Sequence, residues 1–183
     1  MTSWTDLGGG VRVRRSLAFA MNSTLLLDPR HAVLVDPGVL PSELDDIAAA
    51  LREAAPGSLT LVFTHAHWDH VLGRPWWPWA ALVAHPALGP ALERDRASIA
   101  AEAAKCAREH GEEWTRGFEP CAPQIRVAGL CEMRLPPWIL VTRDAPGHGD
   151  SQITIQLPAR RLLIAGDMLS DLEIPWLDRE PAA

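Results

Sequence analysis

The fold is decided by the segment Leu59-Thr60-Leu61-Val62-Phe63-Thr64-His65-Ala66-His67-Trp68-Asp69-His70. Its first five residues form a short apolar run, as expected for a buried strand. Four potential metal ligands follow within six positions: His65, His67, Asp69 and His70. The end of such a strand is where α/β proteins place their sites. Imidazole and carboxylate suit zinc, and also iron or manganese, so the segment predicts a metal site.

Around this segment, strands and helices alternate early and strands dominate late. Apolar runs predict strands at 25–27, 32–35, 59–63 and 81–84, and closing strands at 139–143, 152–157 and 161–165. A helix with Ser42 as its N-cap is predicted to stop at Pro56-Gly57, and a long helix occupies roughly 87–115. Residues 117–138 are rich in proline and predicted to be irregular. The pattern predicts an α/β fold with mixed sheets.

Length and composition set limits on the kind of protein. With 183 residues, 48% of them hydrophobic and 22% charged, we expect one globular domain over residues 1–183. No run of 18 apolar residues and no secretory signal are visible, so we expect neither a membrane partner nor export. The net charge of −6 argues against nucleic acid. Cys106, Cys121 and Cys131 form no C-x-x-C pair and predict reduced thiols in a cytoplasmic protein.

The H-x-H-x-D-H segment resembles the signature of the metallo-β-lactamase superfamily. Ala145-Pro146-Gly147-His148-Gly149-Asp150-Ser151 resembles that family's Pro-Gly-His turn. Leu162-Leu163-Ile164-Ala165-Gly166-Asp167 resembles its strand ending in Gly-Asp. The turn Val35-Asp36-Pro37-Gly38 before the first helix also agrees, so the resemblance covers about residues 10–175.

The resemblance implies an αββα sandwich with mixed sheets and a small-molecule hydrolase built on it. His65, His67 and His148 would hold one Zn²⁺, Asp69 and His70 a second, and Asp167 would bridge them. Asp69 would also be catalytic. The expected reaction is hydrolysis of an ester, thioester or lactone of a small metabolite by a metal-bound hydroxide. His67, where the flavodiiron branch has Glu, favours a hydrolase.

Two alternatives stay open: an iron-dependent sulfur dioxygenase of the same fold, and a family member that binds metal with little or no catalysis. The family usually supplies one more histidine after the bridging aspartate, and this sequence has none after His148. We therefore expect a reduced C-terminal part, with one or two metals per chain. A mononuclear site, a ligand from another chain and a truncated product are all consistent with this. We also expect an uncovered sheet edge near 161–176 and a homodimer.

Several other residues invite a functional interpretation. His85 is predicted to be a structural or surface residue, because the ligand set is already supplied. His110 is predicted to pack partly buried on the apolar face of a helix, and His31 to be a turn residue. Trp76, Trp77 and Trp79 either line an apolar substrate pocket or pack a loop onto the body. Asp150 and Ser151 either orient the ring of His148 or cap its turn.

Overall fold

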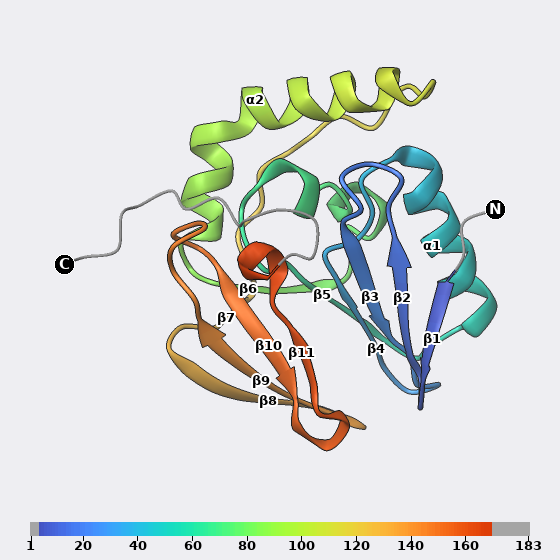
Figure 1. Ribbon diagram of the computed structural model, residues 1–183, viewed down its shortest axis with the longest axis vertical. Helices are drawn as coiled ribbons and strands as arrows, with labels where there is room; N and C mark the ends of the chain where they lie inside the picture. The colour runs from blue at the N-terminus through green and yellow to red at the C-terminus, as the bar shows by residue number, and fades with distance from the viewer. Residues whose placement is uncertain (1–3, 170–183) are drawn as a thin grey trace.

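Two β-sheets form the centre of the chain, and the computed structural model describes residues 4–169 (Figure 1). In sheet 1 the seven strands follow each other as β1 (Trp4–Gly8), β2 (Val11–Arg15), β3 (Asn22–Leu26), β4 (Ala32–Val35), β5 (Leu59–Val62), β6 (Ala81–Ala84) and β7 (Ile125–Arg126). In sheet 2 the order is β11 (Leu162–Ile164), β10 (Ile153–Leu157), β9 (Trp138–Asp144) and β8 (Leu130–Leu135).

A change of strand direction in sheet 1 fixes where functional side chains can gather. Strands β1 to β4 are antiparallel, whereas β4, β5, β6 and β7 run parallel. Val35 pairs with Val62, and Val62 pairs with Val83, so the carboxyl ends of β4, β5 and β6 meet at one edge. Loops that leave this edge can bring their side chains together.

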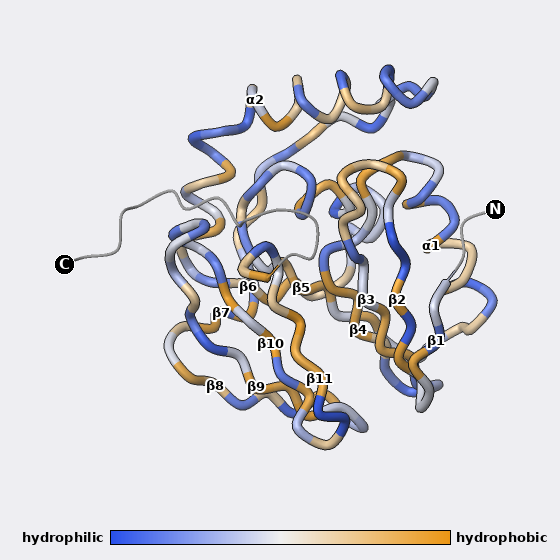
Figure 2. The backbone as a smooth tube through the Cα atoms, viewed as in Figure 1, coloured by the Kyte–Doolittle hydropathy of each residue, from blue (hydrophilic) through white to orange (hydrophobic). Residues whose placement is uncertain are grey.

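The strands of both sheets contain hydrophobic stretches (Figure 2), and the two faces of sheet 1 belong to two different apolar cores. On one face, residues such as Leu34 and Leu61 pack against helices α1 (Pro41–Ala54) and α2 (Leu88–Glu109). On the other face, Val33 and Val62 pack against sheet 2. Side chains alternate between the faces of a strand, so short apolar strands can serve both cores. The predicted α/β class with mixed sheets is confirmed.

Three local expectations need correction. Helix α1 begins at Pro41, whose fixed φ suits a first helical position, so Ser42 is not the N-cap. Helix α2 ends at Glu109 rather than near 115, and Gly111 follows with φ +75°. Residues 117–138 hold β7 and β8, because the prolines lie outside these strands and the alternating side chains of β8 pack inward on the second core.

The expected reduction of the C-terminal part concerns residues 170–183, which lie outside the described residues. Within residues 4–169, β11 is an edge strand of sheet 2 and carries the exposed Leu163. None of the helices in this described part combines the length and apolar character needed to cross a membrane. The assignment of residues 1–183 to one domain stays a prediction.

Candidate metal centre

All six predicted ligands lie at the edge where the parallel strands end. His65 and His67 follow β5 directly, and the 3₁₀ helix η1 (Trp68–His70) carries the next two ligands. His148 comes from the loop between β9 and β10, and Asp167 from the 3₁₀ helix η4 (Gly166–Met168) after β11. Both sheets therefore contribute to one cluster, with donors from segments that are up to about 100 residues apart in sequence.

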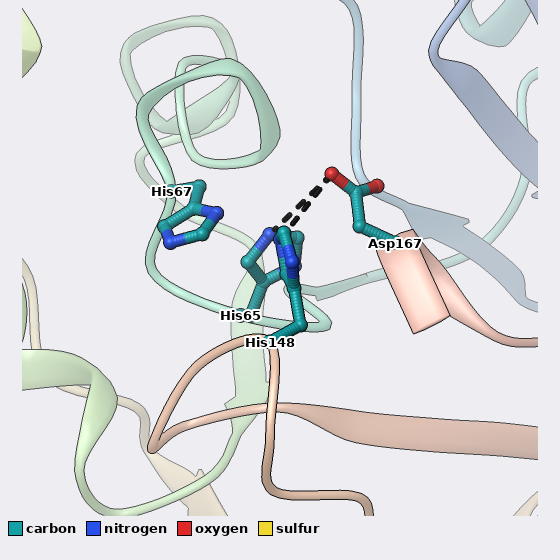
Figure 3. A group of neighbouring side chains, drawn as sticks. All are labelled: His65, His67, His148 and Asp167. Carbon is teal, nitrogen blue, oxygen red and sulfur yellow. Dashed lines mark ion pairs between the residues drawn. The ribbon is translucent and has the colours of Figure 1, made fainter. Parts of the chain in front are cut away.

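Four of these residues form the first donor group: His65, His67, His148 and Asp167. Their potential ligand atoms all lie within 4.8 Å of one another. The ring centroids of the three histidines are 4.4–4.9 Å apart, and the rings meet edge to face (Figure 3). His65 and His148 are buried, whereas Asp167 is 41% exposed, so the group opens toward solvent on the Asp167 side.

A second donor group consists of Asp69, His70 and Asp167. The carboxylate of Asp167 faces both groups. Its Oδ2 lies 3.4 Å from His148 Nε2 and 4.0 Å from His65 Nε2, while its Oδ1 lies 3.1 Å from His70 Nε2. Asp69 Oδ2 is 3.6 Å from the same His70 nitrogen. Asp167 thus lies between the two donor groups, in the position of a carboxylate that could bridge two metal ions.

The electrostatics suit a cation. Burial, together with neighbouring His70 and His67, holds the pKa of His65 well below its usual value, so its ring is neutral and offers a lone pair. Burial alone would raise the pKa of Asp167, but hydrogen bonds from His148 and His70 lower it and keep the carboxylate ionised. Burial also opposes charge on His70, yet Asp69 and Asp36 raise its pKa well above normal. Positive charge is therefore stabilised between these carboxylates.

Asp36, at the end of β4, orients ligands of both groups. Its Oδ1 accepts from the Thr64 backbone N–H at 2.8 Å, and its Oδ2 accepts from the Thr64 hydroxyl at 2.6 Å and from His70 Nδ1 at 2.9 Å. Since the Thr64 hydroxyl gives its only proton to Asp36, it must accept from His65 Nδ1, 3.0 Å away. Both rings are thereby held with Nε2 directed at the donor groups.

Sequence reasoning gave Asp36 no role in the site. The turn Val35-Asp36-Pro37-Gly38 was visible in the sequence, but the register that sets Val35 beside Val62 and brings the carboxylate to the site is seen only in the structure. Asp36 also has φ +46°, a conformation uncommon for residues other than glycine. A strained backbone conformation persists where other contacts hold the residue in place, and three hydrogen bonds to its carboxylate hold Asp36 here.

The residues present fit a divalent metal. His65 Nε2 is buried and makes no hydrogen bond within residues 4–169, although buried polar atoms normally find partners. It faces the other donors of its group (Figure 3). Three imidazoles with one carboxylate form a donor set that suits zinc. The individual ligand roles stay predictions.

The other histidines have local partners. His110 Nδ1 lies 2.9 Å from the Cys106 carbonyl oxygen, and His31 lies between Ser58 and Thr60. His85 accepts a hydrogen bond from the Ala87 N–H and lies 3.9 Å from Asp144. All three belong to neither donor group among the described residues.

The three tryptophans after the metal motif differ from one another. Trp77 is buried in the first core. Trp76 donates to Asp45 at 2.7 Å and contacts the ring of Trp114 at a tilt of 52°, so it packs its loop onto the body. Trp79 is exposed. The packing interpretation therefore holds for Trp76 and Trp77.

The three cysteines are free thiols. Burial is the main cause that raises the pKa of Cys106 to about 11. A thiol with this pKa stays protonated and unreactive near neutral pH.

Comparison with known proteins agrees with this geometry. A family model described as the metallo-beta-lactamase superfamily matches residues 18–182. No curated protein matches the chain. The chain is similar to solved structures of a metallo-beta-lactamase from Pontibacter korlensis (16% identity, TM-score 0.66, covering 94% of this chain and 74% of that one) and of DIM-1 metallo-beta-lactamase (16%, 0.67, 94% and 72%).

A third similar structure is BLEG-1 B3 metallo-beta-lactamase, at 18% identity and TM-score 0.61, with 98% of this chain and 78% of that one covered. At these identities the likeness shows a common fold. The family model extends over most of the chain and includes every residue of both donor groups. The chain therefore belongs to the metallo-beta-lactamase superfamily.

Proposed function

We propose that this protein is a metal-dependent hydrolase that cleaves an ester, thioester or lactone bond of a small metabolite. The observation that carries the proposal is the pair of donor groups sharing Asp167. Oδ2 of this carboxylate faces His65 and His148, and Oδ1 faces His70. Family membership supports the general reaction, and Zn²⁺ is the proposed metal because imidazoles dominate the donors.

The chemistry divides between the metal and the side chains. A divalent ion held by such donors acidifies bound water and polarises a carbonyl oxygen. Asp69 is proposed to be catalytic: its carboxylate accepts the proton that water loses as the water oxygen bonds to the carbonyl carbon. It then delivers this proton to the leaving group as the acyl bond breaks. Asp69 is largely buried and lies against His70, which holds it at the donor groups.

Apolar side chains around Trp68, which is next to two of the ligands in the sequence, support a substrate with an apolar part. Trp68 stands between His67 and Asp69 in the sequence, and Phe19 meets its ring edge to face at 5.6 Å. Phe19 and Leu17 lie on the β2–β3 loop and are exposed by 67% and 71%. Exposed aromatic and aliphatic groups of this kind favour contact with an apolar ligand.

The net charge and the strand β11 support proposals on what the protein binds. A small metabolite fits the proposal better than nucleic acid, because the chain has a net charge of −6. A cytoplasmic location and a homodimer stay proposals. The edge strand β11 with its exposed Leu163 is the surface on which association is expected.

Chelation tests the proposed function. The purified protein, supplied with zinc, is screened on a panel of esters, thioesters and lactones. We expect hydrolysis that a chelator abolishes and added Zn²⁺ restores. His148→Ala should lose the activity. His85→Ala is the matched control, because His85 lies outside both donor groups, and it should retain the activity.

Each of the other outcomes has a meaning. Hydrolysis that resists chelation would refute a metal mechanism and point to a side-chain nucleophile. Iron in place of zinc, with oxidation of a sulfur substrate, would favour the sulfur dioxygenase. Tight metal binding without turnover on any substrate would favour a protein with little or no catalysis.

A further inference from the structure

Three ligand-bearing segments meet at Gln152, a buried residue directly before β10. Its backbone closes the loop that carries His148, because Gln152 N–H donates to Gly149 O at 3.0 Å and Ala145 N–H donates to Gln152 O at 2.9 Å. The next residue, Ile153, donates to Thr64 O at 2.8 Å, directly before His65. The loops that hold two histidine ligands are thus joined here.

The side chain of Gln152 reaches the third segment. Its Nε2 donates to Ile153 O at 2.9 Å and to Ala165 O at 3.3 Å, two residues before Asp167. Gly166, with φ +54°, rests against the same amide: a Cβ added there would lie 2.6 Å from Gln152 Nε2 and 2.9 Å from Thr64 Oγ1. The turn that carries Asp167 therefore packs against the side chains of Gln152 and Thr64.

The orientation of this amide has a cost for the fold. Gln152 Oε1 is buried and accepts no hydrogen bond within residues 4–169. An apolar side chain of similar length would avoid a buried acceptor without a donor. A buried polar atom that lacks a hydrogen bond is a local defect of the kind expected at functional positions. In this orientation the amide places its donor Nε2 against the Ala165 carbonyl oxygen, a hydrogen bond that an apolar side chain could not make.

We propose that Gln152 is a positioning residue that fixes Asp167 relative to the three histidines by holding the Ala165 carbonyl. This inference rests on the proposed metal-dependent function and goes further by assigning a role to a residue that lies outside both donor groups. Without the Nε2 donor, the Gly166–Asp167 turn loses a support and the carboxylate moves away from His148 and His70. The first donor group then keeps its three imidazoles and loses a fixed fourth ligand.

Cobalt binding tests the role. Co²⁺ alone is titrated into the metal-free protein, and its visible absorption reports coordination number and geometry. In Gln152→Met, which keeps the length and removes the donor, we expect altered bands and Co²⁺ affinity lower by about 10-fold, the lower end of effects seen for residues behind metal ligands. Gln152→Asn, one methylene too short to reach Ala165 in the same way, should show the same change. Gln156→Met is the control on the exposed face of β10 and should match the wild type.

The outcomes separate this inference from the function. A wild-type protein that binds no Co²⁺ refutes the proposed function before Gln152 is considered. Wild-type bands and affinity in folded Gln152→Met and Gln152→Asn would overturn the positioning role. Failure of both variants to fold without metal would also contradict it, because the inference assigns Gln152 to the site and not to the cores.

Discussion

Turnover is expected to fall by about 100-fold or more in Asp167→Ala, because losing the shared carboxylate removes several kcal/mol of stabilisation and each 1.4 kcal/mol is tenfold in rate. The variant should fold, since Asp167 is 41% exposed and lies outside the two apolar cores. The measurement is kcat/KM on the best substrate with metal saturating, beside a thermal unfolding curve. Asp167→Asn keeps the shape without the charge and should be impaired as well.

Unchanged kcat/KM in folded Asp167→Ala would remove Asp167 from the site. A fall in rate that excess Zn²⁺ fully reverses would reduce its role to metal affinity. We expect neither outcome but a loss of rate that remains at saturating Zn²⁺, because Asp167 also holds His148 and His70 in place.

The second large effect is on stability and comes from Glu43. This buried carboxylate accepts hydrogen bonds from Ser16 and Leu17 and from the start of α1, and pairs with Arg14 Nη1 at 3.1 Å. Glu43→Ala leaves Nη1 of Arg14, whose side chain is 1% exposed, without this partner, while Nη2 keeps the half-exposed carboxylate of Asp46 at 3.2 Å. Removing one partner of a buried ion pair costs about 3–5 kcal/mol. We expect a loss of that size in urea unfolding.

A matched control is available for Glu43→Ala. Glu112 also binds the start of α1, through the N–H and hydroxyl of Ser42, but at the surface of the molecule. Glu112→Ala should cost about 1 kcal/mol or less, as surface contacts do. Equal losses in the two variants would contradict the role given to burial.

The pH dependence of stability follows from the same group. Burial alone would raise the pKa of Glu43, but hydrogen bonds from Leu17, Ser16, Val39 and Leu40 lower it below its usual value. A carboxyl whose folded pKa is depressed stabilises the protein above the unfolded pKa, about 4.3. That contribution is lost as the pH falls through the folded pKa. Glu43→Gln should therefore show a shallower loss of stability between about pH 5 and 3 than the wild type.

The sequence predicts which donor residues lie close together because their signals are local, and their roles as ligands stay predictions. His65, His67, Asp69 and His70 lie within six residues after a buried strand, and the structure brings them together with His148 and Asp167. The start of α1 was misplaced because Pro41 occupies the first helical position and the side chain of Glu43 accepts from the N–H groups of Val39 and Leu40. Strand β8 was missed because the prolines near it hid a period of two.

The supporting residues were harder to predict for a physical reason. Asp36 contacts Thr64 and His70 from the end of a neighbouring strand, and Gln152 contacts Ala165 between the ends of the paired strands β10 and β11. Asp36 belongs to the turn Val35-Asp36-Pro37-Gly38, but neither its residue type nor that of Gln152 indicates a supporting role at the site. Their importance arises from strand register and from the packing of the Gly166 turn, which a sequence pattern does not contain.

Metal stoichiometry tests the central claim most directly. The purified protein is dialysed against Zn²⁺ and its bound metal per chain is measured, in parallel with His148→Ala and His85→Ala. The first donor group offers four ligands and the second offers three among the described residues, sharing Asp167. We therefore predict one tightly bound Zn²⁺, followed by a weaker one, in the wild type and in His85→Ala, with the tight ion lost in His148→Ala. Undiminished tight binding in folded His148→Ala, or no binding in the wild type, would contradict the account.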